Sequence, residues 1–258
     1  MPAGCAFMYL SLKDKIKSTE FGDHMATADQ LSVLRELTTA TITTILLKKG
    51  IRNTWMRGPM PFADGQQRVA GEAFTLRFVP MREDLATPES WTSPISTRHA
   101  IEDMPEGAIT VVDAMGFTDA GIFGDILVAR MKKRGVQALI TDGVMRDADG
   151  VHDVGLPVWC SGIAAPPSIA GLTFVGWQET IACGGVAVIP GDVVVADGDG
   201  AVLIPAALLD DVVKLGPEQE QLEGWLVSEV EGGAKLPGLY PPNDETKARY
   251  AAWCKEKG

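Results

Sequence analysis

Residues 124–147 place the strongest constraint on the fold of this chain, because they hold a helix, a strand and two turns in close succession. Gly124 permits a tight turn before a helix, and Gly135 is a typical helix stop. The apolar run 138–141 then predicts a buried strand. The unit ends in a turn that carries an adjacent arginine and aspartate, Arg146 and Asp147.

Regular patterns continue along the rest of the 258 residues. Helical spacing marks residues 31–49, 206–215 and 218–231, strand patterns mark 68–79, 108–113, 157–159 and 185–205, and a long polar connection covers 80–104. Strands that alternate with helices, followed by a strand cluster and final helices, predict an α/β or α+β sandwich. A chain of this length suits one domain with extensions or one large domain.

Composition narrows the class of protein. The net charge of −11 argues against a nucleic-acid partner, because phosphate binding needs a basic face. The four cysteines form no C-x-x-C pair, which predicts free thiols in a reducing compartment. No apolar run is long enough for a membrane span, and residues 6–10 are too short for a signal-peptide core. These features predict a cytoplasmic protein without a membrane partner.

The first turn of the helix after Gly124 is a candidate site for a small carboxylic acid. The N–H groups of Ile126 and Leu127 lie where backbone donors lack partners within the helix. A substrate carboxylate could accept hydrogen bonds from them. Asp125 is a good N-cap, however, and an ordinary capped helix stays open as the more common explanation.

Arg146 and Asp147 follow the end of a buried-type strand, which is the favoured place for ligand sites in α/β sheets. Asp147 is therefore a candidate for the single direct carboxylate ligand of Mg²⁺, with water and substrate completing the coordination. The guanidinium of Arg146 suits a carboxylate or an enolate oxygen. A surface ion pair that contributes little energy is the alternative.

Other familiar motifs do not complete a site. The histidines, His24, His99 and His152, are too dispersed for a metal triad. Residues 197–200 resemble the start of a calcium loop but lack the distal glutamate, so they predict a hairpin turn. The glycines at 121–124 follow neither the dinucleotide nor the P-loop pattern, and no G-x-S-x-G elbow is present.

Taken together, these motifs resemble the signature of the RraA-like family. The matching residues are Gly124-Asp-x-Leu127, Gly135-Val136 and Thr141-Asp-Gly-x-x-Arg-Asp147, with further matches at 157–159, 166–167, 188–192 and 196–200. The resemblance covers about residues 28–235. The family contains the class II 4-hydroxy-4-methyl-2-oxoglutarate / 4-carboxy-4-hydroxy-2-oxoadipate aldolases and proteins named regulators of ribonuclease activity.

The resemblance implies an α/β/β/α sandwich similar to swivelling phosphohistidine-type domains, with a C-terminal helical extension. It divides the chain into a poorly ordered leader (1–26), the central domain (27–216), and a C-terminal helix with a proline-rich tail (217–258) that can pack on a neighbouring subunit. It also implies a homotrimer, or a homohexamer made from two trimers.

Functional residues follow from the resemblance by position. Asp147 becomes the metal ligand and Arg146 the catalytic arginine. The turn 124–127 binds the pyruvyl carboxylate, with Gly124 at its start, and Asp125 positions a water or a proton.

The aldolases of the family also bring a glutamate from the neighbouring subunit's C-terminal helix to the metal site. Glu223 is the first positional match and Glu220 the second. Both matches depart from the family pattern, because Trp225 and Val227 replace the basic residues usual around that glutamate.

The implied activity is that of a divalent-metal-dependent aldolase or decarboxylase, with Mg²⁺ or Mn²⁺ as cofactor. It cleaves 4-hydroxy-2-oxo acids, or oxaloacetate, to pyruvate through a metal-stabilised enolate. Arg77, Arg82 and Arg98 could bind the distal carboxylate of such a substrate, or be solvated charges. Two alternatives stay open: a non-catalytic regulator that binds a ribonuclease, and a related lyase or hydratase acting on sugar-derived 2-oxo acids.

Overall fold

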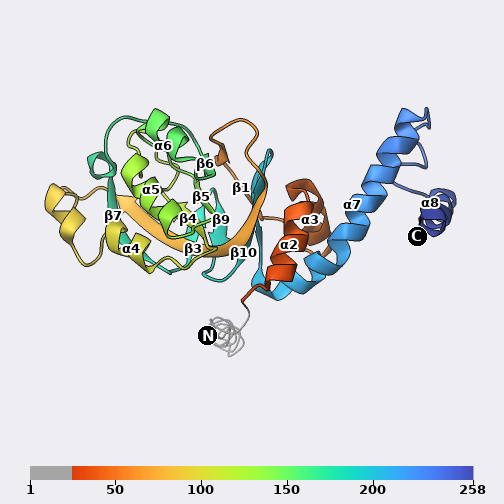
Figure 1. Ribbon diagram of the computed structural model, residues 1–258, viewed down its shortest axis with the longest axis horizontal. Coiled ribbons are helices and arrows are strands. Elements are labelled where there is room, and N and C mark those ends of the chain that lie inside the picture. Colours follow the sequence, from red (N-terminus) through yellow and green to blue (C-terminus); the bar gives the residue numbers. More distant parts are fainter. Residues whose placement is uncertain (1–24, 258) are drawn as a thin grey trace, which may run out of the picture.

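The computed structural model describes residues 25–257, which form a mixed sheet covered by helices on both sides (Figure 1). The strands are β1 (Trp55–Met56), β2 (Met60–Pro61), β3 (Val69–Pro80), β4 (Ile109–Asp113), β5 (Ala138–Thr141), β6 (Val158–Cys160), β7 (Leu172–Trp177), β8 (Ile181–Cys183), β9 (Val186–Val188), β10 (Val193–Asp197) and β11 (Gly200–Ile204). The helices are α2 (Ala28–Glu36), α3 (Thr39–Lys48), α4 (Thr97–Asp103), α5 (Asp125–Lys133), α6 (Ala148–Val154), α7 (Leu209–Glu231) and α8 (Asp244–Lys257).

Strand β3 joins a parallel and an antiparallel half of the sheet. The strand order is β1-β11-β10-β3-β4-β5-β6-β2, with β7 paired to β3 and β8-β9 forming a separate hairpin. The first part of β3 pairs antiparallel with β10, and its later part, from Ala73 to Arg77, pairs parallel with β4. Because β4, β5 and β6 are also parallel, their carboxyl ends lie at one edge of the sheet.

Three apolar layers hold the fold together, and the alternation of side chains along each strand assigns residues to them. Val112 of β4 faces α4, α5 and α6, whereas Val111 faces the hairpin β8-β9 and the antiparallel half. Val194 of β10 belongs to this same central layer, whereas Val193 packs on α2, α3 and α7. The α/β/β/α sandwich implied by the resemblance is thus confirmed.

One continuous helix, α7, replaces the two helices predicted at 206–215 and 218–231. Pro217 lies inside α7, because packing on both sides of it outweighs the lost backbone hydrogen bond. Before the proline, Val212 is buried against α2 and α3; after it, Glu220 accepts hydrogen bonds from Thr38. The predicted boundary between 216 and 217 falls inside this helix. Within residues 25–257, α7 included, no helix is long and apolar enough to cross a membrane.

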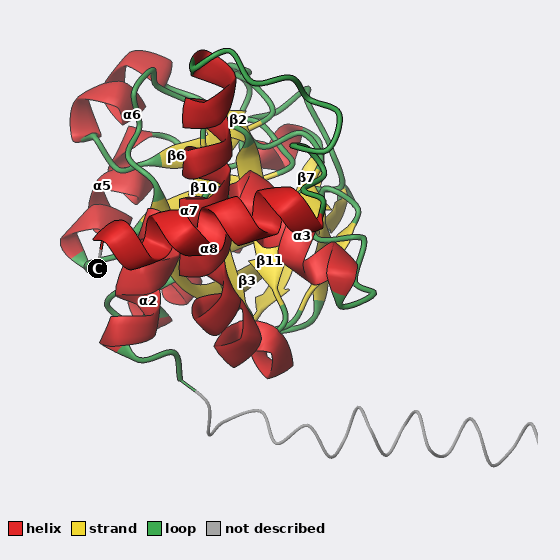
Figure 2. Cartoon of the chain, turned by 90° about the vertical axis from the view of Figure 1, so that its right-hand side faces the viewer, coloured by secondary structure: helices red, strands yellow, loops and turns green. Residues whose placement is uncertain are grey.

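The C-terminal residues pack on the chain's own α7. Figure 1 shows α7 projecting from the sandwich, and Figure 2 shows α8 lying across it. Tyr250 lies 5.4 Å from the ring of Trp225 and 5.9 Å from that of Trp253. Contact with a neighbouring subunit stays a prediction. Residues 1–24 of the predicted leader, His24 among them, lie outside the described part of the chain.

The polar connection predicted at 80–104 contains a short helix that the sequence pattern did not reveal. Helix α4 begins after Ser96, whose hydroxyl accepts the N–H of His99. Thr97, Ala100 and Ile101 of this helix are buried. Three buried positions within seven residues are too few to display a helical period, so only tertiary packing reveals this helix.

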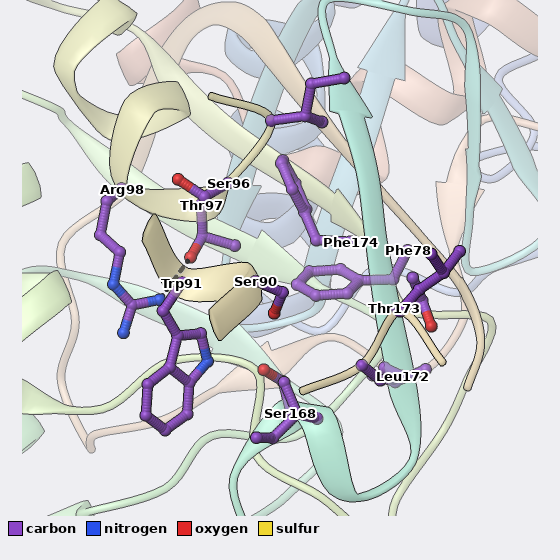
Figure 3. Close-up of a pocket in the computed structure, with 14 residues that line it drawn as sticks. Phe78, Ser90, Trp91, Ser96, Thr97, Arg98, Ser168, Leu172, Thr173 and Phe174 are labelled. Atoms are coloured by element: carbon purple, nitrogen blue, oxygen red, sulfur yellow. Dashed lines mark hydrogen bonds between the residues drawn. The ribbon is translucent and has the colours of Figure 1, made fainter. Parts of the chain in front are cut away.

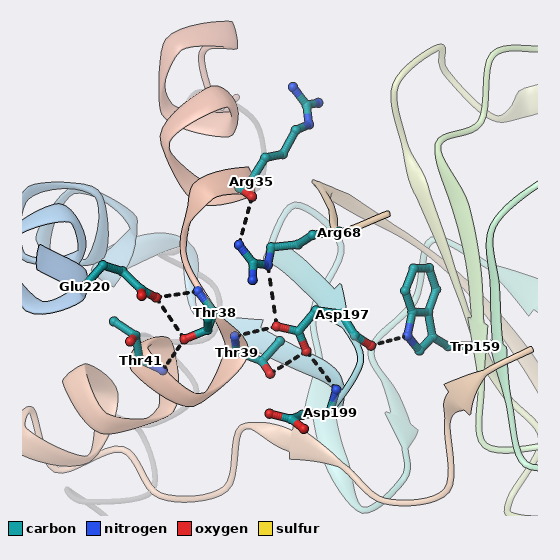
Figure 4. Close-up of polar contacts among 9 residues, drawn as sticks. All are labelled: Arg35, Thr38, Thr39, Thr41, Arg68, Trp159, Asp197, Asp199 and Glu220. Atoms are coloured by element: carbon teal, nitrogen blue, oxygen red, sulfur yellow. Dashed lines mark hydrogen bonds and ion pairs between the residues drawn. The ribbon is translucent and has the colours of Figure 1, made fainter. Parts of the chain in front are cut away.

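Asp197 fixes the helical layer to the turn between β10 and β11 (Figure 4). Its buried carboxylate accepts the N–H of Thr39 at 2.9 Å and the hydroxyl of Thr39 at 2.8 Å. It also accepts the N–H of Asp199 at 3.0 Å and pairs with Arg68 at 3.5 Å. The hairpin turn predicted at 197–200 is confirmed, and the aspartate that resembles a calcium ligand has a structural role.

Asp197→Ala is expected to lower the free energy of unfolding by about 3 kcal/mol, because it leaves Arg68 and two buried donors without their partner. Urea denaturation of the variant measures this loss. Asp199→Ala is the matched control: that side chain is exposed, and the expected change is below about 0.5 kcal/mol. An equal loss of unfolding free energy in both variants would contradict the structural role of Asp197.

Candidate active site

Two loops meet at the carboxyl ends of the parallel strands β4 and β5. The N–H of Ile122 donates to the carbonyl of Val144 at 2.9 Å, and the N–H of Arg146 donates to that of Phe123 at 3.0 Å. Because the strands are neighbours in the sheet, the loop that follows β4 and the loop that follows β5 lie side by side. This edge is where α/β proteins place their ligand sites.

Gly124 and Asp147 are in close contact at this junction. Gly124 is the N-cap of α5, and a Cβ atom built on it would lie 2.2 Å from Oδ2 of Asp147. A side chain at this position would displace the carboxylate from its observed place. The structure therefore brings together two residues that are 23 positions apart in the sequence and that the motif analysis predicted to share a site.

Asp147 has a backbone conformation that is uncommon for residues other than glycine. Its φ of 52° and ψ of 50° place it in the left-handed region, where aspartate and asparagine are the usual exceptions. It is the N-cap of α6, and Nε of Arg146 lies 3.1 Å from its Oδ2. The side chains of Arg146 and Asp147 are 33% and 44% exposed, so ligand can reach both.

Asp125 lies on the other side of the junction. It is the first residue of α5 and not the N-cap that the sequence predicted, because Gly124 already has the extended backbone of the cap. A Cβ on Gly150 of α6 would lie 2.7 Å from its Oδ2. Its Oδ1 accepts the N–H of Ile126 at 2.7 Å. A substrate carboxylate must displace that contact or bind the N–H of Leu127.

Two buried aspartates that the sequence analysis did not select hold the loops in place. Asp142 accepts the N–H of Ala114 at 2.8 Å and that of Gly184 at 3.1 Å, and burial raises the pKa of its carboxyl. Asp113 accepts the N–H groups of Met115 and Ala182. The sequence does contain a signal for them. The adjacent strand β4 ends at Asp113, and β5 is followed immediately by Asp142.

The predicted glutamates lie on α7 and pack on α3 of the same chain. Glu220 accepts the N–H of Thr38 at 2.6 Å and its hydroxyl at 2.8 Å. Glu223 accepts the amide of Gln219 at 2.7 Å and faces the hydroxyl of Thr41 at 3.4 Å. Within one chain they do not join Asp147. A contribution to the site of a neighbouring subunit stays a prediction.

The other predicted side chains are dispersed. Arg77 pairs with Glu179 at 3.8 Å and Arg82 with Asp84 at 2.7 Å. His99 contacts Ser96 within its own helix cap, and exposed His152 lies beside Asp153. Across residues 25–257 there is no group of three or more histidine, cysteine, aspartate or glutamate side chains able to hold a metal ion.

The residues of the junction fit a hard divalent cation nonetheless. Mg²⁺ is commonly held by only one or two protein carboxylates and keeps several water molecules. Asp147 offers one exposed carboxylate, and the missing side chain of Gly124 leaves room for that carboxylate at the junction. The half-buried side chain of Arg146 adds a positive charge that can pair with an anionic ligand.

Comparison with known proteins defines the family. Residues 39–203 match the model of the RraA-like family, described as Aldolase/RraA. RraAS2 of Streptomyces coelicolor, described as an unusual member of the RNase ES inhibitor RraA protein family, superposes with a TM-score of 0.70 at 33% identity. That match covers 78% of this chain and 97% of RraAS2. The chain belongs to the RraA-like family.

Two curated relatives match shorter segments. A protein of Halalkalibacterium halodurans with the provisional name 4-hydroxy-4-methyl-2-oxoglutarate aldolase is 30% identical over 47% of this chain. Protein DlpA of Legionella pneumophila is 25% identical over 59% of this chain. The matches span 57% and 24% of those relatives' own lengths. The family thus includes proteins named for aldolase activity and proteins named for ribonuclease control.

Proposed function

We propose that this protein is a metal-dependent lyase that releases pyruvate from 4-hydroxy-2-oxo acids or from oxaloacetate. The observation that carries the proposal is the contact of Arg146, Asp147 and Gly124 at the carboxyl edge of the parallel strands. A carboxylate for a cation and a guanidinium for a developing anion lie side by side there. The aldolase name of the Halalkalibacterium relative supports the same reaction class.

Asp147 would hold the cation, Mg²⁺ or Mn²⁺. Bound there, the cation would supply a Lewis acid that polarises the 2-oxo group of the substrate. The remaining tasks belong to the chain's own residues.

Arg146 and the start of α5 bind and orient the substrate. The N–H of Leu127 lies in the first turn of α5, where backbone donors and the helix dipole favour a carboxylate. The Arg146 guanidinium stabilises the oxygen that gains negative charge when the bond between C3 and C4 breaks. Both interactions strengthen as charge develops on the pyruvyl unit.

Asp125 moves the proton. Its carboxylate, which lies against Gly150, would take the proton of the 4-hydroxyl group through a water molecule. Loss of that proton turns the C4 hydroxyl into a carbonyl as the C3–C4 bond breaks. A proton returned to C3 then completes pyruvate. For oxaloacetate, the leaving group is carbon dioxide and no hydroxyl proton is removed.

The test is pyruvate release by the purified protein, with Mg²⁺, with Mn²⁺ and with EDTA. The substrates are 4-hydroxy-4-methyl-2-oxoglutarate, 4-carboxy-4-hydroxy-2-oxoadipate and oxaloacetate. We expect pyruvate that depends on the metal and disappears with EDTA. Absence of pyruvate from all three would overturn the proposal and leave another 2-oxo acid substrate or ribonuclease binding as the alternatives.

Ribonuclease binding is a second candidate function, favoured by the 33% identity to RraAS2 over nearly its whole length. A regulator that masks a nuclease works through an exposed protein surface and does not need Asp147. Inhibition of an RNase E-type enzyme that Asp147→Asn leaves unaffected would support this function. Inhibition that is lost in Asp147→Asn would contradict it.

Gly124→Ala tests the geometry of the site. The added Cβ overlaps Oδ2 of Asp147, which is the end of a side chain and can turn away, so the fold is expected to persist. We expect Mn²⁺ affinity to fall about tenfold and kcat about a hundredfold, as for the loss of one positioned catalytic group. Calorimetric titration and the pyruvate assay measure these changes.

The control for this variant is Gly224→Ala on α7, where a Cβ meets no atom within 4 Å. That variant is expected to keep full activity and to gain stability, since alanine is the better helix former. Unchanged Mn²⁺ affinity in Gly124→Ala would show that Asp147 tolerates the displacement and does not hold the cation.

A further inference from the structure

The last turns of α7 carry an open apolar hollow, which we call the distal hollow. Val227 and Val230 line it from α7, and Leu236 and Tyr240 line it from the segment that follows. These four side chains are between 44% and 64% exposed, and the hollow holds about 350 Å³. The space beside β7 in Figure 3 differs, because packed side chains leave only about 30 Å³ there. The distal hollow therefore has room for the side chains of a partner.

The distal hollow continues the face of α7 that packs on the rest of the chain. Val212 on the first half of α7 packs on α2 and α3, and Glu220 and Glu223 contact threonines of the same layer. Val227 and Val230 follow on the same face at helical spacing. Figure 1 shows α7 running on past α2 and α3, so their cover ends before these valines. A large exposed apolar patch of this kind is typical of an interaction surface.

The end of α3 offers the complementary surface. Leu47 is 55% exposed and Ile51 36% exposed, and the side chains of Lys48 and Arg52 beside them are exposed as well. We call these four residues the α3-end patch. Lys48 donates a hydrogen bond to the amide oxygen of Gln219 at 3.1 Å, which is a neutral partner and does not offset the charge of the lysine. The patch is therefore apolar and basic.

The rim of the distal hollow is acidic. Glu223 and Glu231 line it. Glu223 is held by Gln219 and by Thr41, whereas Glu231 is exposed at the end of α7 and can meet a cation. A chain with a net charge of −11 repels its own copies in general, so a contact between copies needs local pairs of opposite charge. Lys48 and Glu231 provide such a pair.

The patch cannot fill the hollow of its own chain. Lys48 contacts Gln219, which precedes Val230 by eleven residues. Eleven residues of α-helix correspond to about 16 Å, and both helices belong to one packed layer. The patch that reaches the hollow must therefore come from another chain.

We propose that the α3-end patch of a second copy of this chain occupies the distal hollow. Leu47 of the partner subunit packs between Val230 and Leu236, and Lys48 of the partner subunit pairs with Glu231. A single contact of this size is small for a stable interface. Each copy carries both surfaces, so a two-fold axis forms the contact twice in one pair of chains. The contact is independent of the proposed lyase reaction.

Disulfide trapping tests the contact in the full chain. One chain with Leu47→Cys and one with Val230→Cys are co-expressed and oxidised, with Cys5→Ser and Cys254→Ser in both so that the native thiols left are buried. We expect a linked dimer that neither chain forms alone. The matched control replaces Val230→Cys by Ile163→Cys, an apolar side chain of the sandwich that is 59% exposed, and should give no linked dimer.

A single chain that carries both Leu47→Cys and Val230→Cys distinguishes the symmetry of the contact. A two-fold contact links the chains in pairs through two disulfides, so the dimer is the final product. A head-to-tail contact would instead give a ladder of longer products or a closed ring.

A charge exchange tests the ion pair. Lys48→Glu and Glu231→Lys are each expected to weaken association of the copies by about tenfold in sedimentation velocity experiments, and the two changes together should restore most of it. Lys133→Glu, an equal change of charge at an exposed position of α5, should keep the wild-type affinity. Because a two-fold contact doubles any smaller assembly, its loss should halve the number of chains in each particle.

The proposal fails if the wild-type protein sediments as a monomer at micromolar concentration. It also fails if Ile163→Cys forms the linked dimer as readily as Val230→Cys, or if Glu231→Lys does not reverse the effect of Lys48→Glu. A ladder of products from the chain with both cysteines would overturn the two-fold arrangement. None of these measurements uses pyruvate release, so the proposed lyase activity is tested separately.

Discussion

Asp147→Asn is expected to lower kcat/KM for the proposed metal-dependent pyruvate release by about a thousandfold, because a Lewis acid held by this carboxylate would contribute several kcal/mol to the rate. Asparagine tolerates the left-handed backbone at this position, whereas alanine would add strain. The thermal unfolding midpoint should therefore stay close to that of the wild type. Calorimetric titration with Mn²⁺ is expected to show the loss of binding directly.

Asp149→Asn provides the control for the loss of a negative charge on α6. That side chain is exposed in the first turn of the same helix. It should retain both Mn²⁺ binding and activity. Normal Mn²⁺ binding by Asp147→Asn would remove Asp147 from the metal site, and equal losses in the two variants would point to a general charge effect.

Arg146→Met is expected to lower kcat by about a hundredfold with a smaller effect on KM, because the guanidinium acts mainly on charge that develops during bond cleavage. Affinity for Mn²⁺ should stay the same or rise. The reason is competition, since Nε of Arg146 lies 3.1 Å from the carboxylate oxygen of Asp147 that the proposed cation would also bind. A structural role alone would not produce opposite changes in turnover and metal affinity.

Arg130→Met on α5 is the matched control, because its guanidinium pairs with Glu102 at the surface. It should keep wild-type turnover. An unchanged kcat in Arg146→Met would exclude this arginine from the reaction. A parallel loss of kcat and Mn²⁺ affinity would instead assign it to the support of Asp147.

The sequence predicts the parallel part of the fold well, because each strand there is a short apolar run bounded by glycine or aspartate. It predicts α5 almost to the residue, since Gly124 and Gly135 mark its limits. It fails at α4, whose period is too short to detect, and at Pro217, which packing keeps inside α7. In both cases, contacts between distant segments decide the local structure.

The sequence also predicted the candidate site only in part. The pairing of Asp147 with Gly124 follows from two motifs that both adjoin strand ends. The left-handed backbone of Asp147 and the supporting hydrogen bonds of Asp113 and Asp142 depend on three-dimensional contacts that no local pattern expresses. Positional matching selected Glu223 first and Glu220 second. Within one chain Glu220 accepts the N–H of Thr38, and a contribution of either glutamate to the site of a neighbouring subunit stays a prediction.

The glycines around the site restrict how its specificity can change. Gly121, Gly124 and Gly150 each lie where a Cβ would come within 2.7 Å of Arg146, Asp147 or Asp125. A library randomised at these three positions should therefore yield almost no active clones. New substrate preferences of the proposed lyase must instead arise in segments that border the site without touching these side chains. The loops outside the glycine positions are therefore the place to diversify this scaffold.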